Sequence, residues 1–140
     1  MALLTAAAVY TFGSGNNALR MKASDDGENV AIEFLISEGY GIQREGEHEI
    51  TIYSLKTGHH SENDIKTKIA QYGKEIAHIS PVKFSGTSAK EDKDYFSSVL
   101  PIYLKKAKGQ KEALAIKAKI FYCSFDQGFC SMQIFRQMVR

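Results

Sequence analysis

The sequence predicts an all-β protein, an antiparallel sandwich of two packed sheets. Short segments in which apolar and polar residues alternate with a period of two are typical of half-buried strands. Polar stretches separate these segments at regular intervals, and the strands do not alternate with helices as they do in a parallel βαβ fold. The 140 residues, 44% hydrophobic and 24% charged, fit one globular domain.

The chain begins with an apolar stretch, residues 1–12, which we interpret as a first strand. An apolar run is also a feature of secretory signals, but this one contains no basic residue. It is also too short to span a bilayer. We therefore expect residues 1–18 to form a tail or first strand and residues 19–140 to form a single β-sandwich domain.

Two segments in the first half alternate most clearly, residues 30–36 and residues 48–55. Both are rich in β-branched and aromatic residues, which suit a pleated surface, so both predict strands. The residues expected to face the core are Val30, Ile32, Phe34 and Ile36 in the first segment and Ile50 and Ile52 in the second.

The middle of the chain carries mixed signals. Apolar residues of segment 64–79 fit a helical stripe, but the first of them also fit a strand, and Gly73 interrupts the pattern. Segment 80–94 collects Pro, Ser, Gly and charged residues. It predicts a long surface loop that holds two apolar residues, Val82 and Phe84.

The second half of the chain predicts three more strands. Residues 95–104 place Leu100, Ile102 and Leu104 on one face, and Pro101 favours an edge position in the sheet. A long alternating segment, 113–123, and a final segment, 130–139, complete the set. The inward residues expected for the long segment are Leu114, Ile116, Ala118, Ile120 and Tyr122.

The charges indicate a solvated surface rather than a nucleic-acid-binding face. The chain has 18 basic and 16 acidic residues, a formal net charge of +2. A lysine cluster occurs in segment 105–112, which predicts a hairpin tip. No aromatic residues interleave with these lysines, as a single-strand-binding surface requires, so we expect no nucleic-acid partner. The cluster consists of Lys105, Lys106, Lys108 and Lys111.

The strongest chemical feature is the cysteine pair Cys123 and Cys130, the only two cysteines in the chain. They stand at the ends of two predicted strands, and Asp126 and Gly128 between them favour a turn. The hairpin brings the cysteines within reach of a disulfide. Such a short loop stabilises the fold by only about 2–3 kcal/mol. The pair is therefore either a staple of the hairpin or a redox centre, and the residues leave both readings open.

A zinc site fits the sequence poorly, so we expect neither a metal nor a cofactor. Two thiolates need two further ligands. The four histidines, His48, His59, His60 and His78, have no spacing that pairs them with the cysteines. A Cys-x-x-Cys motif before a helix, the mark of a thioredoxin active site, is also absent from the sequence.

The cysteine hairpin resembles that of a known family. The strand end Phe121-Tyr122-Cys123, a short turn and then Gly128-Phe129-Cys130 are similar to the N-terminal periplasmic domain of the disulfide reductase DsbD. Residues 34–40 resemble that family's strand followed by a Gly-Tyr turn, and residues 95–104 its Tyr-containing strand. The resemblance spans residues 30–140.

The resemblance implies an immunoglobulin-like β sandwich that exchanges electrons with thioredoxin-like partners, an oxidoreductase activity outside the cytoplasm, in the periplasm. It makes Cys130 the cysteine that meets the partner and Cys123 the resolving one. It makes Phe84 the candidate for an aromatic cap over the pair. Nothing basic adjoins the cysteines in the sequence, so residues brought near by the fold would have to activate them, and Tyr40 and Tyr122 are the candidate neighbours. It implies no membrane insertion of this chain itself.

A second function remains open on the residues alone. An immunoglobulin-like module with a structural disulfide would present a loop or a sheet edge to another protein without any redox chemistry. The reduction potential distinguishes the two, because structural disulfides typically lie below about −300 mV and exchanging ones lie higher.

Overall fold

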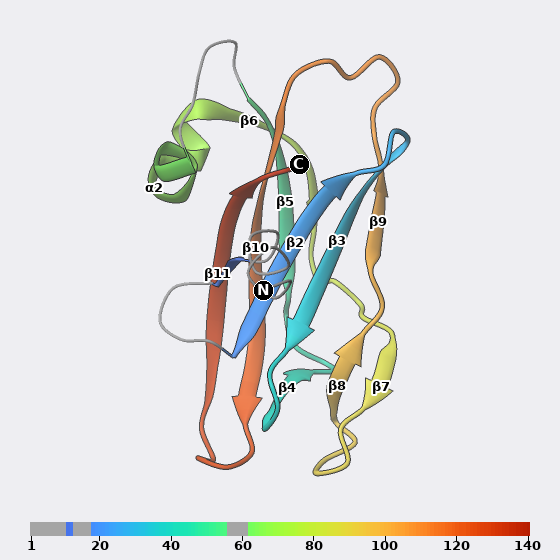
Figure 1. Cartoon of the computed structure of the whole chain (residues 1–140), viewed down its shortest axis with the longest axis vertical. Coiled ribbons are helices and arrows are strands. Elements are labelled where there is room, and N and C mark those ends of the chain that lie inside the picture. Colours follow the sequence, from blue (N-terminus) through green and yellow to red (C-terminus); the bar gives the residue numbers. More distant parts are fainter. Residues whose placement is uncertain (1–10, 13–17, 56–61) are drawn as a thin grey trace, which may run out of the picture.

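Two antiparallel sheets make up the protein (Figure 1). The structure, a computed structural model, describes residues 11–12, 18–55 and 62–140. One sheet has four strands in the order β1-β2-β3-β9. The other has seven, in which β10 pairs with β11 along one edge and with β5 and then β4 along the other. The strands are β1 (Thr11–Phe12), β2 (Leu19–Asp25), β3 (Asn29–Ile36), β4 (Tyr40–Gln43), β5 (Glu49–Leu55), β6 (Gly73–Ile79), β7 (Gly86–Ser88), β8 (Tyr95–Val99), β9 (Ile102–Lys105), β10 (Leu114–Ser124) and β11 (Cys130–Met138).

This architecture confirms the predicted all-β sandwich, and its core lies between the two sheets. In β3 the predicted inward residues Val30, Ile32 and Phe34 are buried, and Ile36 packs against the same core. In β10 all five predicted inward residues are buried. Strand β10 is covered on one face by this core and paired along both edges, so it gives Cys123 a rigid support.

The ambiguous segment 64–79 contains both a helix and a strand. Helix α2 (Glu62–Tyr72) comes first, and β6 follows at Gly73. Ile65 and Ile69, four residues apart on either side of a kink at Lys68, are buried in a second, smaller core on the outer face of the seven-stranded sheet. The helical and strand-like patterns therefore belong to successive elements, and α2 lies at the end of the sandwich away from the β10–β11 turn (Figure 1).

The single strand predicted for residues 95–104 is wrong. The segment forms two strands, β8 and β9, which belong to different sheets. The chain crosses between the sheets at Leu100 and Pro101, and Leu100 is 62% exposed rather than facing the core. Because Pro101 has no N–H for a ladder hydrogen bond, the residues there favour a break over a continuous strand.

Three other expectations also need correction. Residues 105–112 form no hairpin tip, because they connect β9 to β10 across the two sheets. The loop predicted for residues 80–94 contains the short strand β7. Strand β2 was not expected, although its residues alternate between buried and partly exposed positions.

Parts of the predicted first strand and the histidines His59 and His60 lie outside the described residues. Among the described residues, no helix has the length and apolar character needed to cross a membrane.

Candidate functional site

Cys123 and Cys130 form a disulfide across the terminal hairpin, as the sequence predicts. The two residues are direct partners in the β10–β11 ladder, and their Cα atoms lie 4.0 Å apart. The Ser124 N–H donates to the Phe129 carbonyl at 2.8 Å and closes the turn. Gly128 adopts a φ of +69°, a conformation that glycine adopts without steric cost. Local turn chemistry therefore brings the sulfurs together.

The two cysteines differ sharply in exposure. Cys123 is 4% exposed, because it lies on the central strand β10 between β4 and β11, and the side chains of Gln43 and Tyr95 contact its sulfur. Cys130 is exposed at the start of β11, which pairs with β10 along one edge. A reagent or partner in solution therefore reaches the disulfide from the Cys130 side.

Two side chains place hydrogen-bond donors at the buried sulfur. The Gln43 amide N–H donates to Cys123 Sγ, with Nε2 and Sγ 3.6 Å apart. The Tyr95 hydroxyl oxygen lies 3.4 Å from the same sulfur. A disulfide sulfur carries no hydrogen, so the tyrosine hydroxyl is the donor. Gln43 and Tyr95 are themselves partners in the β4–β8 ladder, which fixes both beside Cys123. We call these three residues, with Gly41 and Phe125, the sulfur niche.

Gly41 makes the sulfur niche possible by leaving room for two aromatic rings. It pairs with Cys123 across the β4–β10 ladder. A Cβ at this position would stand 2.7 Å from the Phe125 ring and 2.8 Å from the Tyr95 Cβ, distances that real Cβ atoms essentially never show. With no side chain at Gly41, the rings of Tyr95 and Phe125 meet edge to face with centroids 5.5 Å apart.

Tyr40 and Tyr122, the candidate neighbours of the sulfurs, lie on the core side of the sheet. Tyr122 is 1% exposed, and its ring centroid is 6.0 Å from that of Tyr40, which packs against the same core. Adjacent strand residues point to opposite faces, so the side chain of Tyr122 faces away from that of Cys123. These two tyrosines pack under the hairpin on its core side, whereas Tyr95 lies beside Cys123 Sγ.

Phe84 is a core residue, which corrects the expectation of an aromatic cap in a surface loop. It is 8% exposed, and its ring packs edge to face against Phe34 at 5.6 Å and against His48 at 5.1 Å. A ring held between two others inside the sandwich cannot move as a lid without opening the core.

His48 is a buried histidine that the sequence did not single out as part of the site. Its Nδ1 accepts a hydrogen bond from the Phe121 backbone N–H at 3.0 Å, so this nitrogen is unprotonated. Its Nε2 lies 2.7 Å from the Gln43 carbonyl oxygen and is therefore the donor. The ring is 0% exposed. Only the neutral imidazole, with its proton on Nε2, can make both of these hydrogen bonds.

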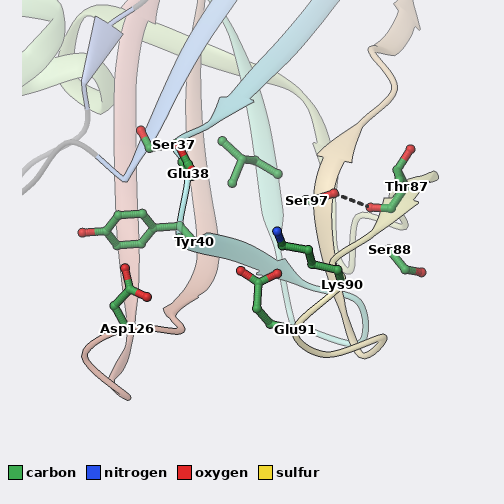
Figure 2. A pocket seen from close by; sticks show the side chains of 11 residues that line it. Ser37, Glu38, Tyr40, Thr87, Ser88, Lys90, Glu91, Ser97 and Asp126 are labelled. Carbon is green, nitrogen blue, oxygen red and sulfur yellow. Dashed lines mark hydrogen bonds between the residues drawn. The ribbon is translucent and has the colours of Figure 1, made fainter.

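A hollow of about 510 Å³ adjoins the hairpin on the side of the β3–β4 turn. Figure 2 shows Tyr40 and Asp126, the latter from the β10–β11 turn, on one side of it, with Lys90 and Glu91 projecting from the loop after β7 on the other. Its lining is mostly polar and charged. The remaining lining residues are Ile36, Ser37, Glu38, Gly39, Thr87, Ser88 and Ser97.

Within the part of the chain that the structure describes, no group of three or more His, Cys, Asp or Glu side chains could hold a metal ion.

Sequence reasoning found the cysteines but missed Gln43, Tyr95 and His48. All three reach the disulfide region through pairing of strands far apart in the chain, since 80 residues separate Gln43 from Cys123. The one local signal is Gly41, a glycine within a strand, which often marks a close approach of other groups.

Comparison with known protein families, with curated proteins and with solved structures finds no match to this chain.

Proposed function

We propose that this domain exchanges electrons with thioredoxin-like partners outside the cytoplasm through the Cys123–Cys130 disulfide, as its resemblance to the N-terminal domain of DsbD implies. The observation that carries the proposal is the asymmetry of the pair. Cys130 is exposed, whereas Cys123 is buried with two donors on its sulfur. A disulfide that only stabilises the hairpin does not require hydrogen-bond donors directed at one of its two sulfurs.

The asymmetry defines an order of bond making and breaking. A partner thiolate attacks Cys130 Sγ in line with the disulfide, and the new bond joins the partner to Cys130. The Cys123–Cys130 bond breaks, and its electron pair stays on Cys123 Sγ as a thiolate. The Tyr95 O–H and the Gln43 N–H stabilise this charge in the sulfur niche. The second thiol of the partner then attacks the partner sulfur of the mixed disulfide, which forms the partner disulfide and releases Cys130 as a thiolate, so two electrons have passed to this domain. In the opposite direction the Cys130 thiolate attacks a partner disulfide, and Cys123 then attacks Cys130 Sγ, reforms the domain disulfide and releases the partner in its reduced form.

The surface around Cys130 suits a protein partner. Phe129, the preceding residue, is 36% exposed, and its ring lies 6.4 Å from that of Tyr122, so it offers an apolar contact on the face of the hairpin opposite the sulfurs. The polar hollow next to the hairpin gives room for a partner's backbone or side chains (Figure 2).

The reduction potential of the disulfide tests the proposal. The protein is equilibrated in glutathione buffers of known ratio at pH 7, the thiols are alkylated, and the reduced fraction is measured by mass. We expect a potential above about −300 mV, the range of exchanging disulfides. A potential well below that value would instead identify a structural disulfide and favour a non-catalytic binding module.

Tyr95→Phe tests the role of the donor at Cys123. This change removes the hydroxyl and keeps the ring against Phe125. A hydrogen bond to the leaving thiolate worth about 1–1.4 kcal/mol corresponds to roughly a fivefold to tenfold slower opening of the disulfide by a small thiol. Tyr103→Phe, at a tyrosine 60% exposed on β9, is the matched control and should leave the rate unchanged. Equal rates for the two variants would exclude this role for Tyr95.

A further inference from the structure

His48 occupies a gap in the pairing of β10. Strand β5 pairs with β10 from Leu114 to Lys119, and β4 pairs with it from Tyr122 to Ser124. Ile120 and Phe121 lie between these two ladders. The His48 Nδ1 accepts the Phe121 N–H at 3.0 Å and takes the place of the missing strand partner.

The same ring also holds the residue that touches the disulfide. Its Nε2–H donates to the backbone carbonyl of Gln43 at 2.7 Å, and the side chain of Gln43 donates to Cys123 Sγ. The loop wraps closely around the ring, since a Cβ at Gly46 would lie 2.7 Å from His48 Cε1. Two hydrogen bonds thus connect the imidazole to the sulfur through one residue.

We infer that His48 is a positioning residue for the disulfide: its neutral ring fixes Gln43 against Cys123, and protonation of the ring loosens that contact and slows disulfide opening. The inference rests on the proposed function, because it concerns the rate of the same exchange. Protonated Nδ1 can no longer accept the Phe121 N–H. Two N–H groups then face each other, so the ring moves away from Phe121. Because its Nε2–H stays bonded to the Gln43 carbonyl, the displaced ring shifts Gln43 and draws its side-chain amide away from Cys123 Sγ.

The surroundings of His48 disfavour the charged ring. Burial lowers the pKa of the imidazole below its ordinary value, and the nearby Lys83 cation adds to this effect, while the hydrogen bond to the Gln43 carbonyl opposes it. Lys83 pairs with Glu45 on the β4–β5 loop at 3.1 Å. On the β10 side the nearest charged side chain along the strand is Lys119, which pairs with Glu49 at 3.4 Å.

The lowered pKa fixes the direction of the pH dependence. Below about pH 6.5, the ordinary histidine pKa, the unfolded chain takes up a proton that the folded chain resists. The contribution of His48 to stability is therefore complete above that pH. It is lost as the pH falls through the window between 6.5 and the lower pKa of the folded state.

The test compares wild type with three single variants from pH 5 to pH 8. His48→Gln keeps a neutral donor and acceptor but does not titrate. Gln43→Leu removes the amide at the sulfur and keeps the backbone carbonyl that His48 binds. His78→Gln removes an exposed histidine on β6 as the matched control. The rate of disulfide opening by dithiothreitol is divided by the rate of His48→Gln at the same pH, which cancels the titration of the reagent.

We expect the wild-type ratio to be constant above pH 6.5 and to fall as the pH drops below it, toward a limit roughly fivefold lower, and His78→Gln to behave as wild type. Gln43→Leu should be slow at every pH with a flat ratio, yet its urea midpoint should still fall on acidification, because His48 still titrates in it. If His48→Gln does not fold, the ratio of wild type to Gln43→Leu serves instead and should fall toward one over the same pH range.

Two results would overturn the inference in distinguishable ways. A wild-type ratio that stays constant from pH 5 to pH 8, in a disulfide that opens readily, removes the role of His48 and leaves the proposed function standing. A disulfide that dithiothreitol does not open at any pH removes the proposed function and this inference with it.

Discussion

Cys123→Ser is expected to capture a thioredoxin-like partner as a stable mixed disulfide, at least about tenfold faster than Cys130→Ser does. In the first variant the remaining thiol is the exposed Cys130, and in the second it is the buried Cys123. Exchange requires in-line approach to a sulfur, so access decides which thiol reacts. Loss of the second cysteine leaves no thiol to resolve the product.

The measurement uses a partner that has one active-site cysteine activated as a mixed disulfide with nitrobenzoate. The thiolate of the variant attacks the partner sulfur, and the coloured nitrobenzoate thiolate leaves, which gives the rate. In urea sufficient to unfold both variants, the two rates should converge, because the intrinsic chemistry of the cysteines is then the same. This control attributes any difference in the folded proteins to burial.

Two outcomes would contradict the expected order. Equal rates in the folded proteins would mean that the exposure of Cys130 does not decide which thiol reacts with the partner. The pair would then be a structural disulfide of the hairpin. Faster capture by Cys130→Ser would reverse the roles of the two cysteines, and the donors Gln43 and Tyr95 would then contact the attacking sulfur.

The parts of the fold that the sequence predicts are those set by local pattern. Strand β10 alternates between buried and partly exposed residues from Ile116 to Tyr122, and the turn residues that follow it lie between the two cysteines, so both the strand and the disulfide follow from neighbouring residues. The same is true of β3, in which the side-chain period of two directly reports which face is buried. Strand β5 is buried on both faces, because Ile50 and Ile52 pack in the main core and Tyr53 packs in the second core.

The errors arise where two elements meet without a strong local break. The join of α2 to β6 at Gly73 mixes two periodicities in one window. The crossing at Leu100 and Pro101 joins two apolar strands that continue in different sheets. Pattern alone cannot show that the second strand leaves the sheet of the first, because sheet membership is a long-range property.

The candidate site also has one part that local sequence predicts and another that it does not. The disulfide is local, but its environment comes from β4 and β8, which reach it by pairing across the sheet. Phe84 shows that a loop-like composition does not place a side chain at the surface. An apolar side chain in a polar stretch signals burial somewhere, and here it is buried between Phe34 and His48 rather than over the sulfurs.

Phe96→Ala should produce the largest loss of stability near the site, about 3–5 kcal/mol, as is typical when a buried phenylalanine is truncated. Phe96 is 1% exposed and pairs with Ile42 in the β4–β8 ladder. The Arg44 guanidinium carbon lies 4.1 Å from the centroid of its ring. Its neighbour Tyr95 points the opposite way, toward Cys123. The ring of Phe96 therefore anchors the strand that holds the tyrosine at the sulfur.

Urea unfolding gives the loss of stability, and native-state amide hydrogen exchange shows where the structure opens. Ile116→Ala is the matched control, since Ile116 is also fully buried and lies on β10 seven residues from Cys123, about 23 Å along the strand. Both variants should lose stability, because each leaves a cavity in the core. Only Phe96→Ala should also lose protection of β4 and β8 amides beyond the global change, since those strands then open locally. If the two variants showed the same exchange pattern, β8 would not be anchored independently by Phe96, and the position of Tyr95 would depend on the whole core instead.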